Sequence, residues 1–246
     1  MPGRLFAFLL VALSALATGA GADTLPLPPN LTDLSSEQGE RYFLESDAVA
    51  GYFPIAANFV TQKTQAYCGV ASIVMVLNAL GAPAPTTPEY QPYHTFTQDN
   101  LLDARTDGVL PREILARQGM TLDQLGALLA LQGVKVEVHH AGDGGLEAFR
   151  AAARAALAAR DHFVIVNYLR LAIGQQIGGH ISPLAAYDSR ADRFLILDVA
   201  RYKYPPVWVA AAELWTAMNT IDPVNDGKTR GWVVVARGDA PAAPAQ

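Results

Sequence analysis

The sequence predicts an α+β fold, and three observations support that class. The chain has 246 residues, of which 51% are hydrophobic and 17% charged, so it can bury one full core. Apolar residues recur mainly at helical spacing in the first half, whereas short β-branched or aromatic runs separated by turn residues dominate the second half. Helices followed by strands, without regular alternation, are typical of α+β domains and disfavour a dinucleotide-binding fold.

The first strongly periodic segment begins at Cys68. Apolar residues recur at helical spacing from Val70 to Leu80, and Gly81 follows where a left-handed helix cap belongs. We therefore predict a largely buried helix over residues 68–80.

Two more helices and a strand are expected in the middle of the chain. Thr121 and Gln124 form a capping-box pattern that opens a helix over residues 122–132. Valines then alternate with charged residues over 134–138, which predicts a half-buried strand. The alanine-rich segment 146–160 is expected to be helical.

The second half supplies the remaining strands. They are expected at 163–166, 180–187, 194–197 and 232–235, and one helix over 211–218 interrupts them. The turn residues 188–192 separate two of these strands, and positions 180 and 198 lie symmetrically about residue 189. If these strands form a hairpin, His180 and Asp198 stand nearly opposite each other, with Cβ atoms about 5 Å apart.

The N-terminus has the pattern of a secretory signal peptide. Arg4 precedes an apolar run over 5–17 and small residues ending at Ala22, where we expect cleavage. The run is short for a membrane span of about 20 residues, although an uncleaved anchor is the alternative. After cleavage of residues 1–22, we expect a periplasmic or secreted protein without membrane association. Residues 23–36 are expected to be extended, 37–238 to form one folded domain, and 239–246 to be a disordered tail.

Charge and cysteine content exclude several function classes. The chain has 18 Lys and Arg against 23 Asp and Glu, so no strong positive field favours nucleic acid or an anionic membrane. One cysteine cannot close an intramolecular disulfide, and five scattered histidines do not complete a zinc site with it. His139 and His140 are expected on opposite faces of a strand, so we predict no metal site. The patterns of zincins, serine hydrolases and P-loops are absent from the sequence.

The predicted place of Cys68 at a helix N-terminus favours a reactive thiolate. The positive end of the helix dipole and the free N–H groups there stabilise negative charge. A buried structural cysteine is the alternative, because free cysteine behaves as a small hydrophobe.

A nucleophilic cysteine also needs a base and a group that orients the base. His180 and Asp198 are the candidates, although an ordinary core histidine and a strand-ending aspartate explain them singly. Gln62 lies six residues before Cys68, where its amide could serve an oxyanion together with the backbone N–H of Cys68. A solvated loop glutamine is the alternative for Gln62.

Three uncommon strings carry a family resemblance. In order, they are Gln65-Ala-Tyr-Cys68-Gly-Val-Ala-Ser72, Gly179-His180-Ile-Ser-Pro183 and Leu197-Asp198-Val-Ala-Arg201-Tyr-Lys203-Tyr204-Pro-Pro206. The chain closely resembles the phytochelatin synthase family over residues 48–235. This resemblance implies a papain-like cysteine-protease fold for the catalytic domain, residues 37–238. It also implies roles for the four candidates: Cys68 as nucleophile, His180 as general base and acid, Asp198 as orienter, and Gln62 as the oxyanion-hole side chain.

The resemblance implies glutathione as the substrate, attacked at its Cys–Gly bond. Glycine then leaves, and a γ-glutamylcysteinyl thioester forms on Cys68. The residues that the family match places around this acyl group are Asn167, Gly179, Asp222 and Arg230. Those matched to the second-substrate stretch are Arg201, Lys203 and Tyr204. Arg can clamp a carboxylate and Asp can pair with an ammonium, although Arg201 and Lys203 could equally form surface ion pairs.

The chain resembles the short bacterial members of the family, because the cysteine-rich region of plant members does not follow Arg237. This implies that water mainly intercepts the thioester, giving glycine and γ-glutamylcysteine. A full synthase that transfers the acyl group to a second glutathione is the alternative. A non-catalytic module that binds glutathione or a soft metal through Cys68 is an alternative of another class. We expect no tightly bound cofactor. Cadmium or zinc would enter as part of the substrate, a metal–glutathione thiolate. The sequence is compatible with either a monomer or a homodimer.

Overall fold

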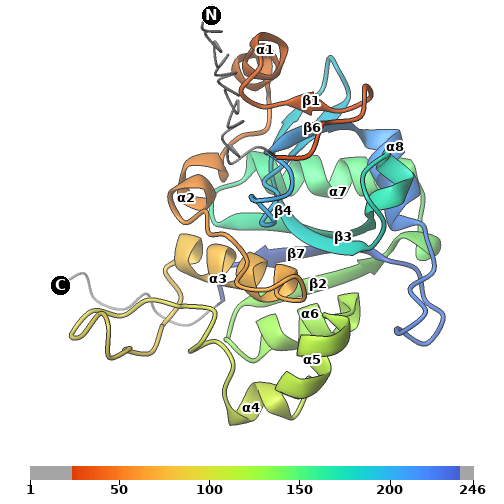
Figure 1. Ribbon diagram of the computed structural model, residues 1–246. Helices are drawn as coiled ribbons and strands as arrows, with labels where there is room; N and C mark the ends of the chain where they lie inside the picture. The colour runs from red at the N-terminus through yellow and green to blue at the C-terminus, as the bar shows by residue number, and fades with distance from the viewer. Residues whose placement is uncertain (1–23, 239–246) are drawn as a thin grey trace, which may run out of the picture.

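A computed structural model describes residues 24–238 and confirms the α+β class (Figure 1). Seven strands form one antiparallel sheet in the order β1-β6-β5-β4-β3-β7-β2. The strands are β1 Thr32–Asp33, β2 Lys135–His140, β3 His162–Leu169, β4 Gly179–Asp188, β5 Arg193–Ile196, β6 Val207–Ala210 and β7 Gly231–Ala236. The helices are α1 Glu37–Glu45, α2 Tyr52–Ala57, α3 Cys68–Leu80, α4 Ala104–Asp107, α5 Arg112–Gln118, α6 Leu122–Ala130, α7 Leu146–Ala158 and α8 Ala211–Met218, with 3-10 turns η1 Ala141–Asp143 and η2 Arg170–Ile173.

Helices cover both faces of the sheet. Successive strand residues point to opposite faces, so Phe163 and Ile165 of β3 join one hydrophobic cluster while Val164 and Val166 join a second. Helices α3 and α6 pack on the first face, and α7 and α8 pack on the second (Figure 1). Two buried faces explain why the central strands are continuous apolar runs in the sequence.

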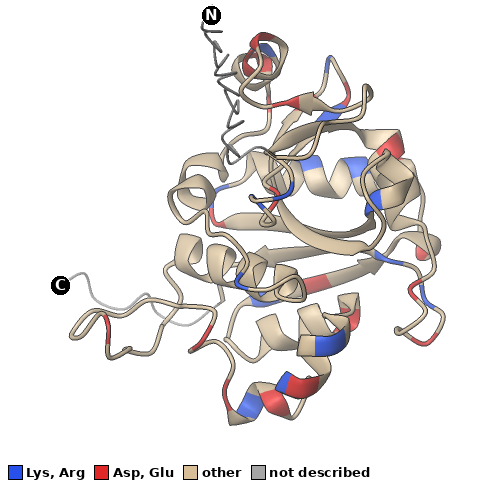
Figure 2. Cartoon of the chain, viewed as in Figure 1, with Lys and Arg blue, Asp and Glu red and all other residues tan. Residues whose placement is uncertain are grey.

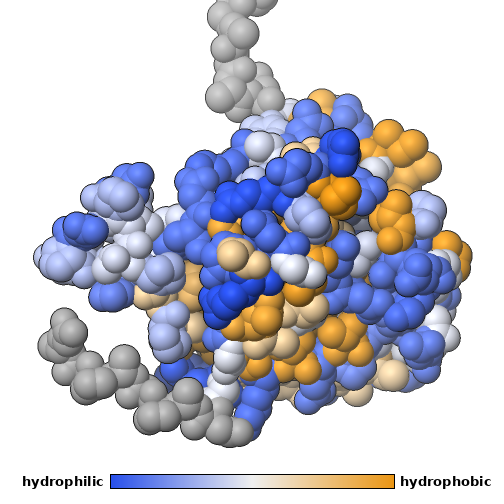
Figure 3. All heavy atoms as spheres, turned by 90° about the horizontal axis from the view of Figure 1, so that it is seen from below, coloured by the Kyte–Doolittle hydropathy of each residue, from blue (hydrophilic) through white to orange (hydrophobic). Residues whose placement is uncertain are grey.

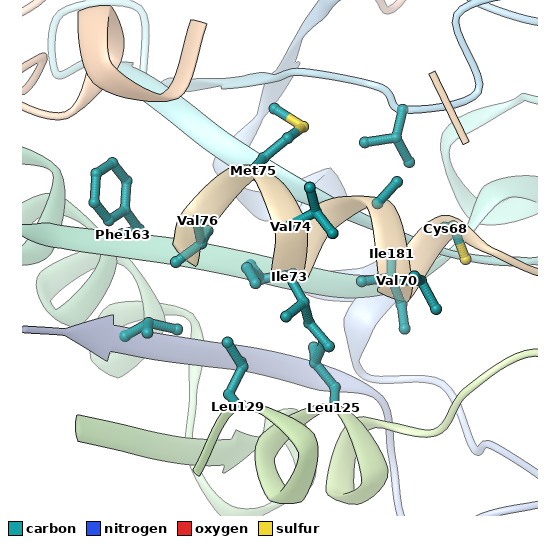
Figure 4. Packing of buried hydrophobic residues seen from close by; sticks show 14 of the residues in the cluster. Cys68, Val70, Ile73, Val74, Met75, Val76, Leu125, Leu129, Phe163 and Ile181 are labelled. Atoms are coloured by element: carbon teal, nitrogen blue, oxygen red, sulfur yellow. The ribbon is translucent and has the colours of Figure 1, made fainter. Parts of the chain in front are cut away.

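Helix α3 is buried along most of its length and carries no charged residue. Figure 4 shows its apolar side chains among Phe163 and Ile181 of the sheet and Leu125 and Leu129 of α6. Charged residues lie instead on outer helices such as α4 and α5 and on loops (Figure 2). The helix ends where Gly81 adopts a φ of 62°, which confirms the left-handed cap.

Most other predicted elements are confirmed, with shifted ends. The capping box of Thr121 and Gln124 forms, but the helix that it opens ends at Ala130 rather than at 132. Helix α7 ends at Ala158, two residues before the predicted end. Strands β1 and β6 and helices α2, α4 and α5 were not predicted, because segments of two to seven residues carry little periodicity. The nine-residue helix α1, which Ser36 caps, was also missed.

The predicted register of the β4–β5 hairpin is wrong. Asp188 pairs with Arg193, and a bulge follows between Leu184 and Ala186, so the turn is not centred on residue 189. The Asp188 carboxylate accepts backbone N–H groups of the turn, and Asp192 adopts a φ of 50°, which accommodates four turn residues. Strand β5 ends before Asp198, so His180 and Asp198 are not opposed in the ladder.

The described part of the N-terminal segment lies along the sheet edge. Strand β1 pairs with β6, and the Leu25 N–H donates to the Lys203 carbonyl at 2.9 Å. Residues 1–22, the predicted signal peptide, and 239–246, the predicted tail, lie outside the described residues. Among residues 24–238, no helix combines the length and apolar character that crossing a membrane requires.

Candidate active site

Cys68 is the first residue of α3, at the wall of a cavity of about 490 Å³. Figure 4 shows its sulfur at the N-terminal end of the helix, away from the packed apolar side chains. Burial opposes ionisation of the thiol. Hydrogen bonding to His180, the charge of that ring and the backbone N–H groups of Gly69 and Ile181 outweigh burial and lower the pKa of Cys68.

Gly69 lets Met120 lie close to the first turn of α3, beside the thiol of Cys68. A Cβ at this position would lie 2.7 Å from the sulfur of Met120, which also lines the cavity. A side chain at residue 69 would therefore force Met120 to move away from the first turn of α3.

His180 lies on β4 opposite Tyr168 of β3, whose ring it meets edge-on. Its Nε2 lies 2.8 Å from Asp198 Oδ1 and 2.9 Å from Ser182 Oγ, which leaves Nδ1 for the thiol of Cys68. Burial disfavours the charged ring, and Arg170 adds to that effect. The Asp198 carboxylate and the Cys68 contact outweigh both and raise the pKa of His180.

Asp198 lies behind His180 and is fully buried. Arg170 Nη2 lies 2.9 Å from Oδ1 and Nη1 lies 2.8 Å from Oδ2, while the Ala200 N–H donates to Oδ1 at 2.9 Å. Burial alone would raise the pKa of Asp198, but His180 and Arg170 hold it well below its ordinary range. The residue is an ionised carboxylate with four hydrogen-bonding or ionic contacts to hold it in place.

Arg170 was missed by the sequence analysis. It begins η2, and its buried guanidinium also contacts the Gln175 side chain and lies 5.1 Å from the centroid of the Tyr204 ring. The Tyr204 hydroxyl accepts the backbone N–H of Gln176 at 2.9 Å. Tyr204, predicted to contact substrate, therefore lies behind the Asp198–Arg170 pair and is buried.

Gln62 is buried beside the segment that carries Asp198. Its backbone N–H donates to the Val199 carbonyl at 2.9 Å. Its side-chain Nε2 donates to the Thr64 carbonyl at 2.8 Å and to the Tyr202 hydroxyl at 3.0 Å. Gln62 does not line the cavity that holds Cys68, and the N–H groups of its amide are occupied by protein acceptors.

The cavity beside Cys68 and His180 gathers four more predicted residues. They are Asn167, Gly179, Asp222 and Arg230. Arg230 Nη2 lies 3.6 Å from Asp222 Oδ1, and Nη1 donates to the Ile221 carbonyl at 2.7 Å. Arg230 Nε is buried and has no hydrogen-bond partner among the described residues.

Arg201 and Lys203 do not line this cavity. The Arg201 guanidinium lies 4.6 Å from the centroid of Phe59, which lines a second cavity of about 780 Å³. That cavity lies between residues 57–63, α3 and part of the segment 86–100, which stands out from the body in Figures 1 and 3. Polar and apolar residues are interspersed on the face shown in Figure 3.

The structure offers no candidate metal cluster within residues 24–238. His139 stacks on Trp232, whereas His140 faces Asp123 and the Thr229 carbonyl. The predicted divergence of these adjacent histidines is therefore confirmed.

The chemistry of the arrangement follows from its charges. A thiol beside a protonated imidazole, which a buried carboxylate orients, can exist as a thiolate–imidazolium pair. Such a pair can attack a carbonyl carbon and return a proton to the leaving group. The four residues at this site come from α3, β4, the segment after β5 and η2, so only the fold assembles them.

Comparison with known proteins identifies one family. A model of the family described as phytochelatin synthase matches residues 22–232. Glutathione gamma-glutamylcysteinyltransferase 1 of Lotus japonicus is 37% identical over 216 residues, which cover 87% of this chain and 42% of that protein. The enzyme of the same name from Arabidopsis thaliana is 35% identical over 217 residues, covering 87% and 43%. The Schizosaccharomyces pombe enzyme is 27% identical, covering 85% and 50%. The chain thus spans about half the length of these curated relatives.

Proposed function

Because the chain belongs to the phytochelatin synthase family, we propose that it cleaves the Cys–Gly bond of glutathione through a thioester on Cys68. Its relatives are named as transferases of the γ-glutamylcysteinyl group. The observation that carries the proposal is the Cys68–His180–Asp198 series at one cavity, with a lowered thiol pKa and a raised imidazole pKa. Helix α3 against a sheet that carries the histidine fits the papain-like arrangement.

In the acylation step, the Cys68 thiolate attacks the carbonyl carbon of the cysteinyl residue of glutathione. The tetrahedral oxyanion collapses, the C–N bond breaks, and His180 gives its proton to the departing glycine nitrogen. Asp198 keeps the ring oriented and stabilises its charged form. Free glycine and the γ-glutamylcysteinyl thioester are the products.

The oxyanion needs donors near the Cys68 backbone N–H. Gln62 can serve if its Nε2 exchanges the Tyr202 hydroxyl for the oxyanion, because that contact, at 3.0 Å, is the longer of its two. The exposed Tyr202 ring can move without disturbing the core.

The cavity matches the charged groups of the γ-glutamyl end. The Asp222 carboxylate suits the ammonium group, and the guanidinium of Arg230 suits the α-carboxylate. Asn167 and Gly179 also line the cavity, together with Cys68 and His180. A cavity of about 490 Å³ lies within the usual size range of ligand sites, about 300–1,000 Å³.

Water is the proposed main acceptor of the thioester. In the deacylation step, His180 takes a proton from water, the oxygen attacks the thioester carbonyl, and γ-glutamylcysteine and the thiolate separate. The basic residues proposed for a second glutathione, Arg201 and Lys203, lie outside the cavity that holds Cys68. Transfer to a second glutathione, free or as a cadmium or zinc thiolate, is therefore the minor reaction.

The test is incubation of the protein with glutathione and mass spectrometry of glycine, γ-glutamylcysteine and longer oligomers. Cys68→Ala should lower glycine release by about 10³-fold or more, because no other thiol exists in the chain. The melting temperature of the variant is the control for its fold. Equal glycine release by Cys68→Ala and wild type contradicts the proposal.

A further inference from the structure

The loop between α8 and β7 forms the wall of the cavity that carries Asp222 and Arg230. It is a small hairpin, in which Ile221 bridges Thr229 and the Asp222 N–H donates to the Lys228 carbonyl at 2.9 Å. We call residues 219–230 the clamp loop. Its two charged wall residues can meet the substrate only if the whole hairpin is held against the body of the protein.

A cluster of polar side chains holds the clamp loop against the body of the protein. His140 Nδ1 lies 2.6 Å from the Thr229 carbonyl oxygen, and His140 Nε2 lies 2.8 Å from Asp123 Oδ1. The Lys228 ammonium donates to Asp123 Oδ2 at 2.7 Å. Asp123 thus links helix α6 to the end of β2 and to the clamp loop at once.

The ring of His140 has an oxygen acceptor at each nitrogen. The side chain of His140 is 12% exposed, so water replaces neither contact easily.

The attachment continues along the backbone to the substrate side. The Ala141 N–H donates to the Arg230 carbonyl at 2.9 Å, and the Gly142 N–H donates to Thr229 Oγ1 at 2.9 Å. Residues 140–142 therefore hold the two residues at the end of the clamp loop, one of which is Arg230. A shift of the loop of about 1 Å would lengthen the contacts of Asp222 and Arg230 to a bound substrate beyond hydrogen-bonding distance and so weaken binding.

We propose that His140, with Asp123 and Lys228, is a positioning residue that sets the affinity for glutathione without touching it. This inference rests on the proposed function, because it assigns the clamp loop to substrate binding. Its signature is a change in KM while kcat stays the same, since Asp222 and Arg230 bind the substrate away from the reacting bond.

The experiment compares His140→Gln and Asp123→Asn with wild type in glutathione turnover. Each variant should raise KM about tenfold and change kcat less than about twofold, because uniform binding is lost. Lys228→Arg keeps the charge, so the KM of this variant should be close to that of wild type. Asp161→Asn is the matched control, because it breaks an exposed ion pair with Arg237 on the same sheet without involving the clamp loop.

A second measurement separates this inference from the proposed function. Calorimetry of glutathione binding to Cys68→Ala, with and without His140→Gln, reports affinity without turnover. About tenfold weaker binding in the double variant supports the cluster even if wild type releases no glycine. Equal affinities, or a loss confined to kcat, overturn the inference. Absence of binding in both proteins contradicts the inference and the proposed function together.

Discussion

Two clusters in this molecule each contain an aspartate, a histidine and a cationic side chain, and they differ in burial. Asp198, His180 and Arg170 have side-chain exposures of 0%, 4% and 3%, whereas Asp123, His140 and Lys228 have 39%, 12% and 49%. The carboxylate lies 2.8 Å from its histidine in both. The aspartate–histidine distance therefore does not distinguish the two clusters.

The surroundings decide what each cluster does. In the buried cluster, neighbouring charges act with little screening, and they hold the pKa of Asp198 down and that of His180 up. In the second cluster, Asp123 and Lys228 are partly exposed, so water and salt weaken their attraction. This cluster can fasten a loop but cannot fix the charge of a reacting group. The first suits chemistry, and the second suits positioning.

The largest expected difference is in the rate of catalysis. Asp198→Asn should lower kcat/KM for glycine release by about 10²- to 10³-fold, because the amide no longer stabilises the imidazolium of His180. Asp123→Asn should leave kcat within about twofold of wild type. Steady-state kinetics of both variants measure this. Similar losses of kcat in the two would remove the distinction between the clusters.

The next difference concerns stability. Arg170→Met leaves the buried Asp198 carboxylate with only His180 and the Ala200 N–H as partners, so the free energy of unfolding should fall by about 3–5 kcal/mol. Lys228→Met removes an exposed partner and should cost about 1 kcal/mol or less. Urea unfolding at neutral pH compares the two proteins. Equal losses would mean that burial does not govern the strength of these contacts.

The pH dependence of alkylation tests whether Cys68 and His180 of the buried cluster form an ion pair. The lowered pKa of Cys68 and the raised pKa of His180 both favour the thiolate–imidazolium pair over the neutral pair. Iodoacetamide should therefore label Cys68 about tenfold faster than glutathione at pH about 6, where an ordinary thiol is almost entirely protonated. His180→Gln should remove this advantage. A labelling profile that matches a free thiol in wild type argues against the pair.

The smallest expected effect is that of Arg201→Ala. Its guanidinium lies against Phe59, outside the cavity of Cys68, so glycine release should stay within about twofold of wild type. The minor γ-glutamylcysteine oligomers should disappear, because a cation for the second glutathione is lost. Product analysis at high glutathione with cadmium or zinc measures both. Equal loss of both products would place Arg201 at the first site.

The parts of the site that the sequence could predict are those with a local pattern. The periodicity of 68–80 and the cap at Gly81 place Cys68 at a helix N-terminus, and the structure agrees. The hairpin argument brought His180 and Asp198 together through a wrong register. They meet because Asp198 lies beyond the end of β5, where the chain leaves the ladder and the carboxylate can reach the ring.

The other parts depend on contacts between distant segments. Arg170 follows a strand and resembles any polar residue at a strand end, and only tertiary packing buries it against Asp198 and Tyr204. The link from Asp123 to His140 and Lys228 joins three separate segments. No periodicity or motif encodes such contacts, so sequence reasoning missed them.

The central claim is that glycine leaves before the acyl group does, and interception of the thioester tests it most directly. Glutathione is mixed with the protein in the presence of hydroxylamine, an amine that attacks thioesters. If the thioester forms, γ-glutamylcysteine hydroxamate should appear at the expense of γ-glutamylcysteine, and glycine release should not slow. Cys68→Ala should form neither product. Unchanged γ-glutamylcysteine formation without any hydroxamate, or either product from Cys68→Ala, would contradict it.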